Sequence, residues 1–192
     1  MRTRKLILSN FQAPGDIVML TAAVRDLHAC YPGQFVTDVR TLCPALWENN
    51  PYITPLDIKG DNVENIYCHY PLVHRSNEAR KHFIYGFIEF LNERLNLNIQ
   101  PTAMKGDIHL SEKERNTSLT SLLREIRCSE NTHSNLPFWL IVSGGKYDFT
   151  IKWWDAKRYQ QTVDYFKDLI RFVQVGEDKH HHPPLQNVID LR

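Results

Sequence analysis

The stretch LILSNFQAPGDIVMLTAAVRDLHACYP, residues 6–32, decides the fold of this chain. It starts with the end of an apolar run (residues 5–8) that predicts a buried β-strand, and turn-forming residues follow at 13–15. From Asp16 the apolar residues recur at helical spacing, at Ile17, Leu20, Ala23, Val24 and Leu27. Asp16 therefore stands where a strand gives way to a helix, at the edge where open α/β sheets bind their ligands.

The carboxylate of Asp16 has two interpretations. An Asp in the first turn of a helix commonly bonds free backbone N–H groups and complements the helix dipole. A carboxylate at the carboxyl end of a strand can instead act on a bound substrate. The residue types alone leave both open.

Overall composition is that of an ordinary globular protein. The chain has 192 residues, a formal charge of +1, 42% hydrophobic and 23% charged residues. Near-zero charge argues against a nucleic-acid binder, which normally carries a basic face. No apolar run approaches the roughly 20 residues of a membrane span, and the run after the N-terminal basic residues is too short for a signal peptide. We expect a cytoplasmic protein.

The four cysteines, at positions 30, 43, 68 and 128, are widely scattered. Without C-x-x-C pairs, a zinc site is not supported by spacing. The even count permits disulfides, but a chain of this size without an export signal normally keeps its thiols reduced. We expect reduced, structural thiols and no metal cofactor.

The rest of the first half alternates strands and helices, which is typical of a parallel, doubly wound sheet. Strands are predicted at 35–40, 53–58, 65–70 and 106–111, and a short helix at 44–50. The pattern of residues 76–97 predicts a long core-packing helix with Ser76 as N-cap, and residues 111–114 resemble a capping box that opens a helix to about residue 126. The polar segment 129–135 is the predicted boundary between domains at 1–130 and 136–192.

The second half repeats the strand–loop–helix–strand plan. Strands are predicted at 137–142 and 171–176, with a helix at 156–169 between them. The connecting loop holds Ser143, Gly144 and Gly145, and then Thr150 and Lys152. Closely approaching glycine N–H groups, a hydroxyl and a lysine before a helix start favour a phosphate ligand. The loop is neither a Walker A motif nor a dinucleotide fingerprint.

Both halves resemble glycosyltransferase family nine, the heptosyltransferase-type sugar transferases. The opening match is a strand, Gly-Asp (Gly15-Asp16), a small-residue helix and Tyr-Pro, residues 31–32. The second match is Ser-Gly-Gly, Lys-x-Trp with Lys152, and Val-Gln-Val-Gly at residues 173–176. The resemblance implies an α/β fold of Rossmann-like GT-B type, with a complete N-terminal domain and a partial second domain.

The resemblance also implies roles for individual residues. Asp16 is expected to be the general base that faces the acceptor. Ser143, Gly144, Gly145, Thr150 and Lys152 are expected to bind the donor phosphates without a metal. The acceptor side is expected to include Asn10, Gly15, His74 and Arg75.

The reaction implied is inverting transfer of a heptose-like sugar from a nucleotide-sugar donor to a glycan or lipid-linked acceptor, as in lipopolysaccharide synthesis. Substrates would lie between the two halves. The expected partners exclude nucleic acid and include peripheral contact with the inner membrane, and a second copy or a complementing chain.

Family members carry further donor-binding turns after a segment like residues 185–191, and this chain ends at Arg192. The expectation is a shortened donor domain, and a non-catalytic binding or assembly protein remains the alternative. A sugar-nucleotide epimerase is a third possibility on the same architecture. The run His180-His181-His182 before two prolines is interpreted as a surface loop, because a zinc site needs further spaced ligands.

Overall fold

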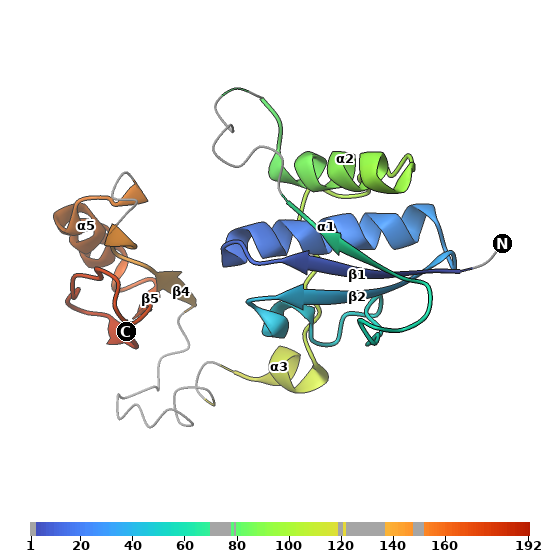
Figure 1. Cartoon of the computed structure of the whole chain (residues 1–192). Helices are drawn as coiled ribbons and strands as arrows, with labels where there is room; N and C mark the ends of the chain where they lie inside the picture. Colours follow the sequence, from blue (N-terminus) through green and yellow to red (C-terminus); the bar gives the residue numbers. More distant parts are fainter. Residues whose placement is uncertain (1–2, 70–77, 79, 119–120, 122–136, 148–151) are drawn as a thin grey trace. The chain divides into compact units, whose positions relative to one another are not determined.

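The chain forms two compact units, Met1–Thr117 and Ser118–Arg192. The computed structural model describes residues 3–69, 78, 80–118, 121, 137–147 and 152–192 (Figure 1). The predicted linker at 129–135 lies outside these residues. Within the described part, none of the helices is both long enough and apolar enough to cross a membrane.

The first unit contains a parallel three-stranded sheet of order β2-β1-β3. The strands are β1 (Arg4–Asn10), β2 (Phe35–Thr41) and β3 (Val63–Tyr67). Leu6, Ile7 and Leu8 of β1 are fully buried, as a central strand of a parallel sheet requires. The chain moves from β1 to β2 on one side and then crosses to β3 on the other. The carboxyl end of β1 is therefore the topological switch point, where such sheets bind ligands.

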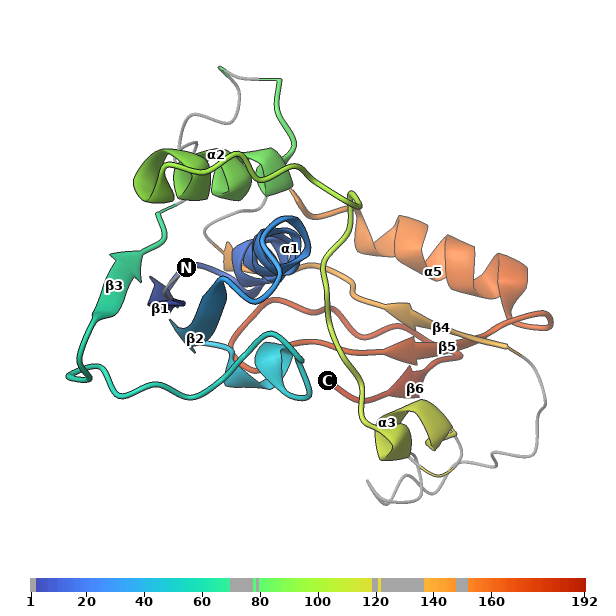
Figure 2. The ribbon, with the colours of Figure 1, turned by 90° about the vertical axis from the view of Figure 1, so that its right-hand side faces the viewer.

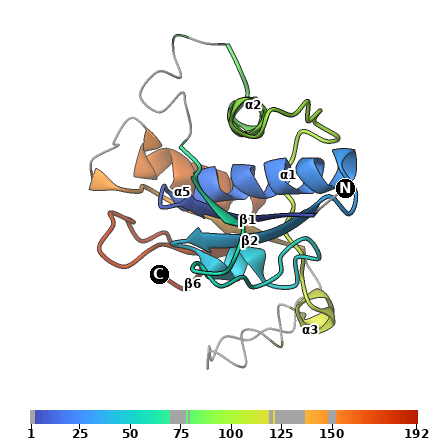
Figure 3. The same cartoon turned by 45° about the vertical axis from the view of Figure 1, so that its right-hand side comes forward.

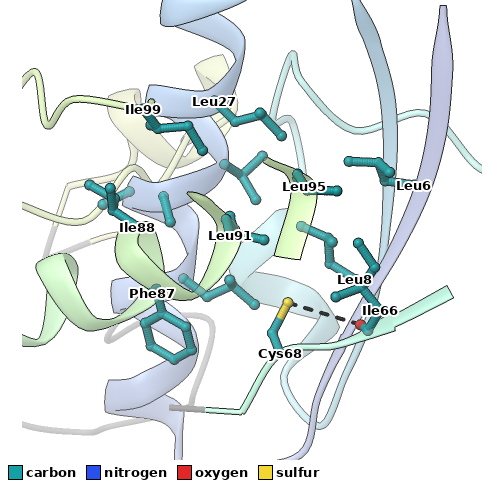
Figure 4. Close-up of a cluster of buried hydrophobic side chains, with 14 of the residues drawn as sticks. Leu6, Leu8, Leu27, Ile66, Cys68, Phe87, Ile88, Leu91, Leu95 and Ile99 are labelled. Carbon is teal, nitrogen blue, oxygen red and sulfur yellow. Dashed lines mark hydrogen bonds between the residues drawn. The ribbon is translucent and has the colours of Figure 1, made fainter. Parts of the chain in front are cut away.

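Two helices lie on the same side of this sheet, α1 (Pro14–Cys30) and α2 (Phe83–Leu95) (Figures 1 and 3). Their apolar faces meet the sheet in one cluster (Figure 4). The labelled members include Leu8 of β1, Leu27 of α1 and Leu91 of α2. Each such fully buried side chain contributes about 1.5–3 kcal/mol to folding. This core fixes the direction in which α1 leaves the sheet edge.

The predicted strand at 53–58 does not form. Only Ile53 makes a bridge, to Thr37, and the N–H of Thr54 donates to the carbonyl oxygen of Thr37 (2.8 Å), but the ladder goes no further. The buried carboxylate of Asp38 accepts the N–H of Leu56 (2.7 Å) and pairs with Arg40 (2.6 Å). A side chain of β2 thus takes the hydrogen bond that a neighbouring strand would supply.

The segment 106–111 is likewise not a strand, because it runs against α1. The N–H of Asp107 donates to the hydroxyl of Thr21 (2.8 Å), and a Cβ on Gly106 would lie 2.5 Å from the Val18 side chain. Arg25 of α1 holds the preceding residues by donating to the carbonyl oxygen of Ala103 (2.8 Å).

Helix boundaries also differ from the prediction. Helix α2 begins at Phe83, and the ring of His82 caps it by accepting the N–H of Ile84 (3.2 Å). The predicted cap, Ser76, lies outside the described residues. The capping box of Ser111 and Glu114 is confirmed, but the helix it opens, α3 (Glu112–Asn116), is short. The 3-10 helix η1 (Pro44–Trp47) matches the predicted short helix.

The second unit has its own parallel sheet, of order β4-β5-β6. Its elements are β4 (Phe138–Ile141), α5 (Ala156–Phe166), β5 (Arg171–Gln174) and β6 (Ile189–Asp190) (Figure 2). Val163 of α5 packs with Ile141 and Phe172 of the sheet. The side chain of Asp155 caps α5 by accepting the N–H of Lys157 (2.8 Å). The α/β prediction is confirmed in both units.

Candidate active site

The carboxylate of Asp16 lies in the first turn of α1 and does not cap it. The N-cap residue is Ala13, which makes no side-chain cap bond. Asp16 is partly buried, and its carboxylate has no hydrogen-bond or ion-pair partner among the described residues. The helix dipole favours a negative charge there. A carboxylate with this freedom, at the switch point of the sheet, can accept a proton from a ligand.

Asn10 and Gly15, predicted on the acceptor side, have different surroundings. Asn10 is fully buried, and its amide donates to the carbonyl oxygen of Cys68 (2.9 Å) while its oxygen accepts the N–H of Gln12 (2.9 Å). This side chain ties the loop before Asp16 to the end of β3. Gly15 is exposed, and an added Cβ would meet nothing within 4 Å. The fold itself therefore does not require glycine at position 15.

Exposed aromatic rings border the same loop. Phe11 and Tyr67 are 50% and 55% exposed, and their ring centroids lie 6.3 Å apart. His69 stacks on Tyr67 at 6.4 Å. The sequence reasoning missed Phe11 and Tyr67. The available signal was an aromatic residue at the carboxyl end of each of two neighbouring strands. His74 and Arg75 lie outside the described residues.

The glycine loop of the second unit is closed by the segment that carries the histidine run. The N–H of Gly145 donates to the carbonyl oxygen of His181 (2.9 Å), and the N–H of His181 donates back to Gly145 (3.0 Å). Gly144 has φ +91°, and an added Cβ would lie 2.0 Å from the His181 oxygen. The close contact between this loop and His181 therefore explains why glycine stands at both positions.

The side chain of Ser143 is engaged in the same way. It is fully buried, and its hydroxyl donates to the carbonyl oxygen of Pro183 (2.7 Å) and accepts from the amide of Gln174 (2.7 Å). Of the predicted phosphate ligands, the N–H of Gly144 has no partner in the described part of the chain, and Lys152 is exposed. Thr150 lies outside the described residues.

The histidine run lies in a loop, and its rings contact other residues of the second unit. His182 bonds the carbonyl oxygen of Ser143 through Nδ1 (3.0 Å) and accepts the N–H of Glu177 at Nε2 (3.2 Å). These two contacts fit the neutral ring with its proton on Nδ1. Among residues with described positions, no cluster of three or more His, Cys, Asp or Glu could hold a metal ion.

An aromatic cluster stands beside the glycine loop. The rings of Trp153 and His181 stack at 4.6 Å, and Tyr147 contacts both at 5.8 Å. Tyr147 is 65% exposed, so one ring of the cluster faces solvent, and another, Trp153, follows Lys152 directly in the sequence. The sequence could not reveal this cluster, because His181 reaches it from a distant segment.

Three cysteines fall in the described part, and all three are free thiols. Cys68 is buried, and burial raises the pKa of its thiol to about 12. Such a thiol is an unreactive packing group at neutral pH.

Two units with parallel sheets, a helix start at the switch point of one and a glycine loop before the helix of the other, define a Rossmann-like α/β protein consistent with the GT-B type. Among solved structures, the chain is similar to the glycosyl transferase family 9 protein from Veillonella parvula DSM 2008, with a TM-score of 0.63. The match covers 99% of this chain and 70% of that one at 15% identity, and it shows a shared fold. No family model and no curated protein matches the sequence.

Proposed function

We propose that this protein is a glycosyltransferase that moves a heptose-like sugar from a nucleoside-diphosphate donor to an acceptor hydroxyl with inversion. The single observation that carries the proposal is the carboxylate of Asp16 at the switch point of the sheet, which has no hydrogen-bond or ion-pair partner among the described residues. The fold shared with a glycosyl transferase family 9 protein supports it.

In the proposed reaction, Asp16 takes the proton of the acceptor hydroxyl while that oxygen attacks the anomeric carbon. The bond between the anomeric carbon and the diphosphate oxygen breaks, and the nucleoside diphosphate leaves with its negative charge. Lys152 and the N–H of Gly144 would stabilise that charge, which grows in the transition state. The chain's own residues supply this stabilisation in the proposal, with no metal cofactor assigned.

In the proposal, two of the five predicted donor-site residues bind the diphosphate directly, Gly144 through its N–H and Lys152 through its side chain. The hydroxyl of Ser143 and the N–H of Gly145 are already bonded within the unit, so their role in the proposal is to shape the loop. The exposed ring of Tyr147 offers a surface on which a nucleobase can stack. Asn10 likewise positions the loop of Asp16 instead of contacting the acceptor.

The acceptor class in the proposal is a glycan or a lipid-linked sugar that reaches the protein at the cytoplasmic face of the inner membrane. Asp16, the proposed base, belongs to the first unit, and Lys152, the proposed donor ligand, belongs to the second.

Donor binding tests the role of Lys152. We expect Lys152→Ala to weaken the binding of nucleoside diphosphates by about tenfold or more, as loss of a charged hydrogen bond of 1.5–3 kcal/mol implies. Lys167→Ala, at an exposed lysine of the same unit, is the matched control. Calorimetric titration with ADP, GDP and UDP measures both variants. Equal affinity of Lys152→Ala and the wild type would refute the assignment, and binding without turnover would favour the non-catalytic alternative.

A further inference from the structure

Strand β4 is the counterpart, in the second unit, of the central strand β1 of the first. Each is the first strand of its sheet along the chain and is followed by a helix that packs on that sheet. However, β1 pairs on both sides, with β2 and β3, whereas β4 lies at one edge and pairs with β5 alone among the described strands (Figure 2). Its sequence, Phe-Trp-Leu-Ile followed by Val142, is typical of the interior of a parallel sheet. Strand β4 thus has the sequence of an interior strand and the position of an edge strand.

The side chains of β4 alternate between the two faces of the sheet. Trp139 lies on the face that α5 covers, because its ring contacts the ring of Phe166 with centroids 6.2 Å apart. The residues at alternate positions lie on the opposite face, where Phe138, Leu140 and Val142 are 44%, 64% and 48% exposed. A row of exposed apolar side chains on one strand is typical of a surface that binds another protein chain.

The backbone of β4 also offers unpaired groups at the free edge. The carbonyl oxygen of Ile141 accepts the N–H of Val175 (3.0 Å), so the odd-numbered residues of β4 bond β5. Because the backbone direction alternates, Phe138 and Leu140 point their N–H and C=O groups away from β5. Natural edge strands usually carry a charge, a central proline or a bulge that prevents pairing, yet residues 137–145 include no charged residue. This edge is therefore open to a further strand.

The exposed surface continues from β4 onto one side of α5. On the side toward β6, the oxygen of Gln160 accepts a backbone N–H from the segment just before that strand (2.8 Å). Helical spacing places Thr162 and Tyr165 on the other side. There, Thr162, Tyr165 and Phe166 line a groove of about 660 Å³ along α5. Since Phe166 also contacts Trp139, the groove and β4 form one continuous surface.

A second copy of this chain fits this surface. Strand β4 is uncharged, so two copies can pair without placing like charges opposite each other. A four-residue strand alone is small for a stable dimer, which buries about 1,200–2,000 Å² in total. The groove side of α5 adds to that area, and its charged lining residues, at positions 155–158, lie at the far end from Tyr165, where a polar rim is expected.

We propose that the chain forms a two-fold symmetric dimer in which the β4 strands pair antiparallel into one continuous sheet. Leu140 lies on the axis and faces Leu140 of the second copy, and Phe138 faces Val142 of the second copy. The two α5 helices then lie on the same face of the joined sheet. The dimer rests on β4 and α5 alone, and it holds whether or not the protein transfers a sugar.

Sedimentation velocity of the full chain over a dilution series tests the proposal. We expect a reversible dimer. Leu140→Lys places two like charges opposite each other and removes two apolar contacts, so it should raise the dissociation constant of the dimer at least about tenfold. Val142→Lys repeats the test just beyond β4 and should act in the same direction. Leu42→Lys, at a leucine of the first unit that is 65% exposed, is the matched control and should dimerise as the wild type does, as should Asp16→Asn.

Hydrogen exchange shows that each variant is folded and which edge of β4 is paired. The amides of Trp139 and Ile141 face β5 and should stay protected in the wild type and in both lysine variants of β4. The amide of Phe138 should be protected only in the dimer, and should exchange fast on dilution and in Leu140→Lys. A wild type that stays monomeric overturns the proposal, including one whose Phe138 amide is protected by another part of the chain. Folded Leu140→Lys or Val142→Lys protein that dimerises as tightly as the wild type also overturns it.

Discussion

The N–H of Gly145 donates a 2.9 Å hydrogen bond to the carbonyl oxygen of His181, so the glycine loop is bound by a distant part of its own chain. A glycine pair before a helix is typical of a phosphate site, but here the same pair is required by an internal contact. The histidine run thus packs against the glycine loop and holds it in place, with His182 hydrogen-bonded to the backbone of Ser143 and Glu177. Of the groups predicted to bind the donor, the N–H of Gly144 and the side chain of Lys152 remain available in the proposal.

Gly144→Ala should destabilise the second unit strongly. Its Cβ would lie 2.0 Å from the His181 oxygen, at a φ of +91° that side chains rarely adopt. The expected loss exceeds about 2 kcal/mol in the free energy of unfolding, since strain and a steric clash combine. Chemical denaturation followed by tryptophan fluorescence measures it. Stability equal to the wild type would mean that the contact with His181 does not form.

Gly15→Ala separates a structural role of this glycine from a role in binding. An added Cβ meets nothing within 4 Å, and alanine favours a helix by about 0.5–1 kcal/mol over glycine. We expect an unchanged or raised melting temperature together with reduced sugar transfer, because the methyl group would stand beside the acceptor at Asp16. Thermal unfolding and turnover are measured on the same preparation. Full turnover with normal stability would remove Gly15 from the acceptor site.

Cys68 should resist thiol reagents in the folded protein. Burial raises the pKa of its thiol to about 12, so almost no thiolate is present at neutral pH. Cys30 and Cys43 are partly exposed and should react first. Peptide mapping after timed alkylation with iodoacetamide distinguishes the three, with denatured protein as the control. Labelling of Cys68 as fast as Cys43 under native conditions would contradict its burial.

His28 should make the first unit less stable in mild acid. Burial lowers the pKa of this ring below its ordinary value of 6.5. Below that value the unfolded chain binds a proton that the folded chain does not, so the free energy of unfolding falls as the pH drops through 6.5. His28→Gln should therefore lose less stability than the wild type between about pH 7.5 and pH 5.5.

The matched control is His69→Gln, a change at an exposed ring that should keep the wild-type pH dependence. An identical pH profile for His28→Gln and the wild type would show that His28 titrates alike in the folded and unfolded chain.

Local patterns were sufficient to predict the elements that bury a continuous apolar face. The first strand and helix, the second strand, and the strand and helix of the second unit all occur where the sequence placed them. Residues 53–58 were predicted as a strand, but the N–H of Leu56 donates to the side-chain carboxylate of Asp38 and not to a neighbouring strand, a contact that periodicity cannot reveal. The start of α2 was misplaced because the ring of His82, which is an unusual cap, holds it.

The candidate site was only partly predictable for the same reason. The place of Asp16 in the first turn of α1, shortly after β1, could be predicted because strand, turn and helix follow one another directly in the sequence. The hydrogen bonds of Ser143 and Gly145 are made with residues in the range 174–183, about 30 to 40 positions further along the chain, and no spacing rule in the sequence predicts them.

The most direct test of the central claim is the release of nucleoside diphosphate from a panel of nucleotide sugars by the wild type and by Asp16→Asn. Asp61→Asn, at an exposed loop position, is the matched control. The account predicts turnover by the wild type and by Asp61→Asn, and a loss of at least about a hundredfold in Asp16→Asn with donor affinity unchanged, as expected for removal of a general base. Turnover by Asp16→Asn at the wild-type rate, or release by none of the three proteins, would contradict it.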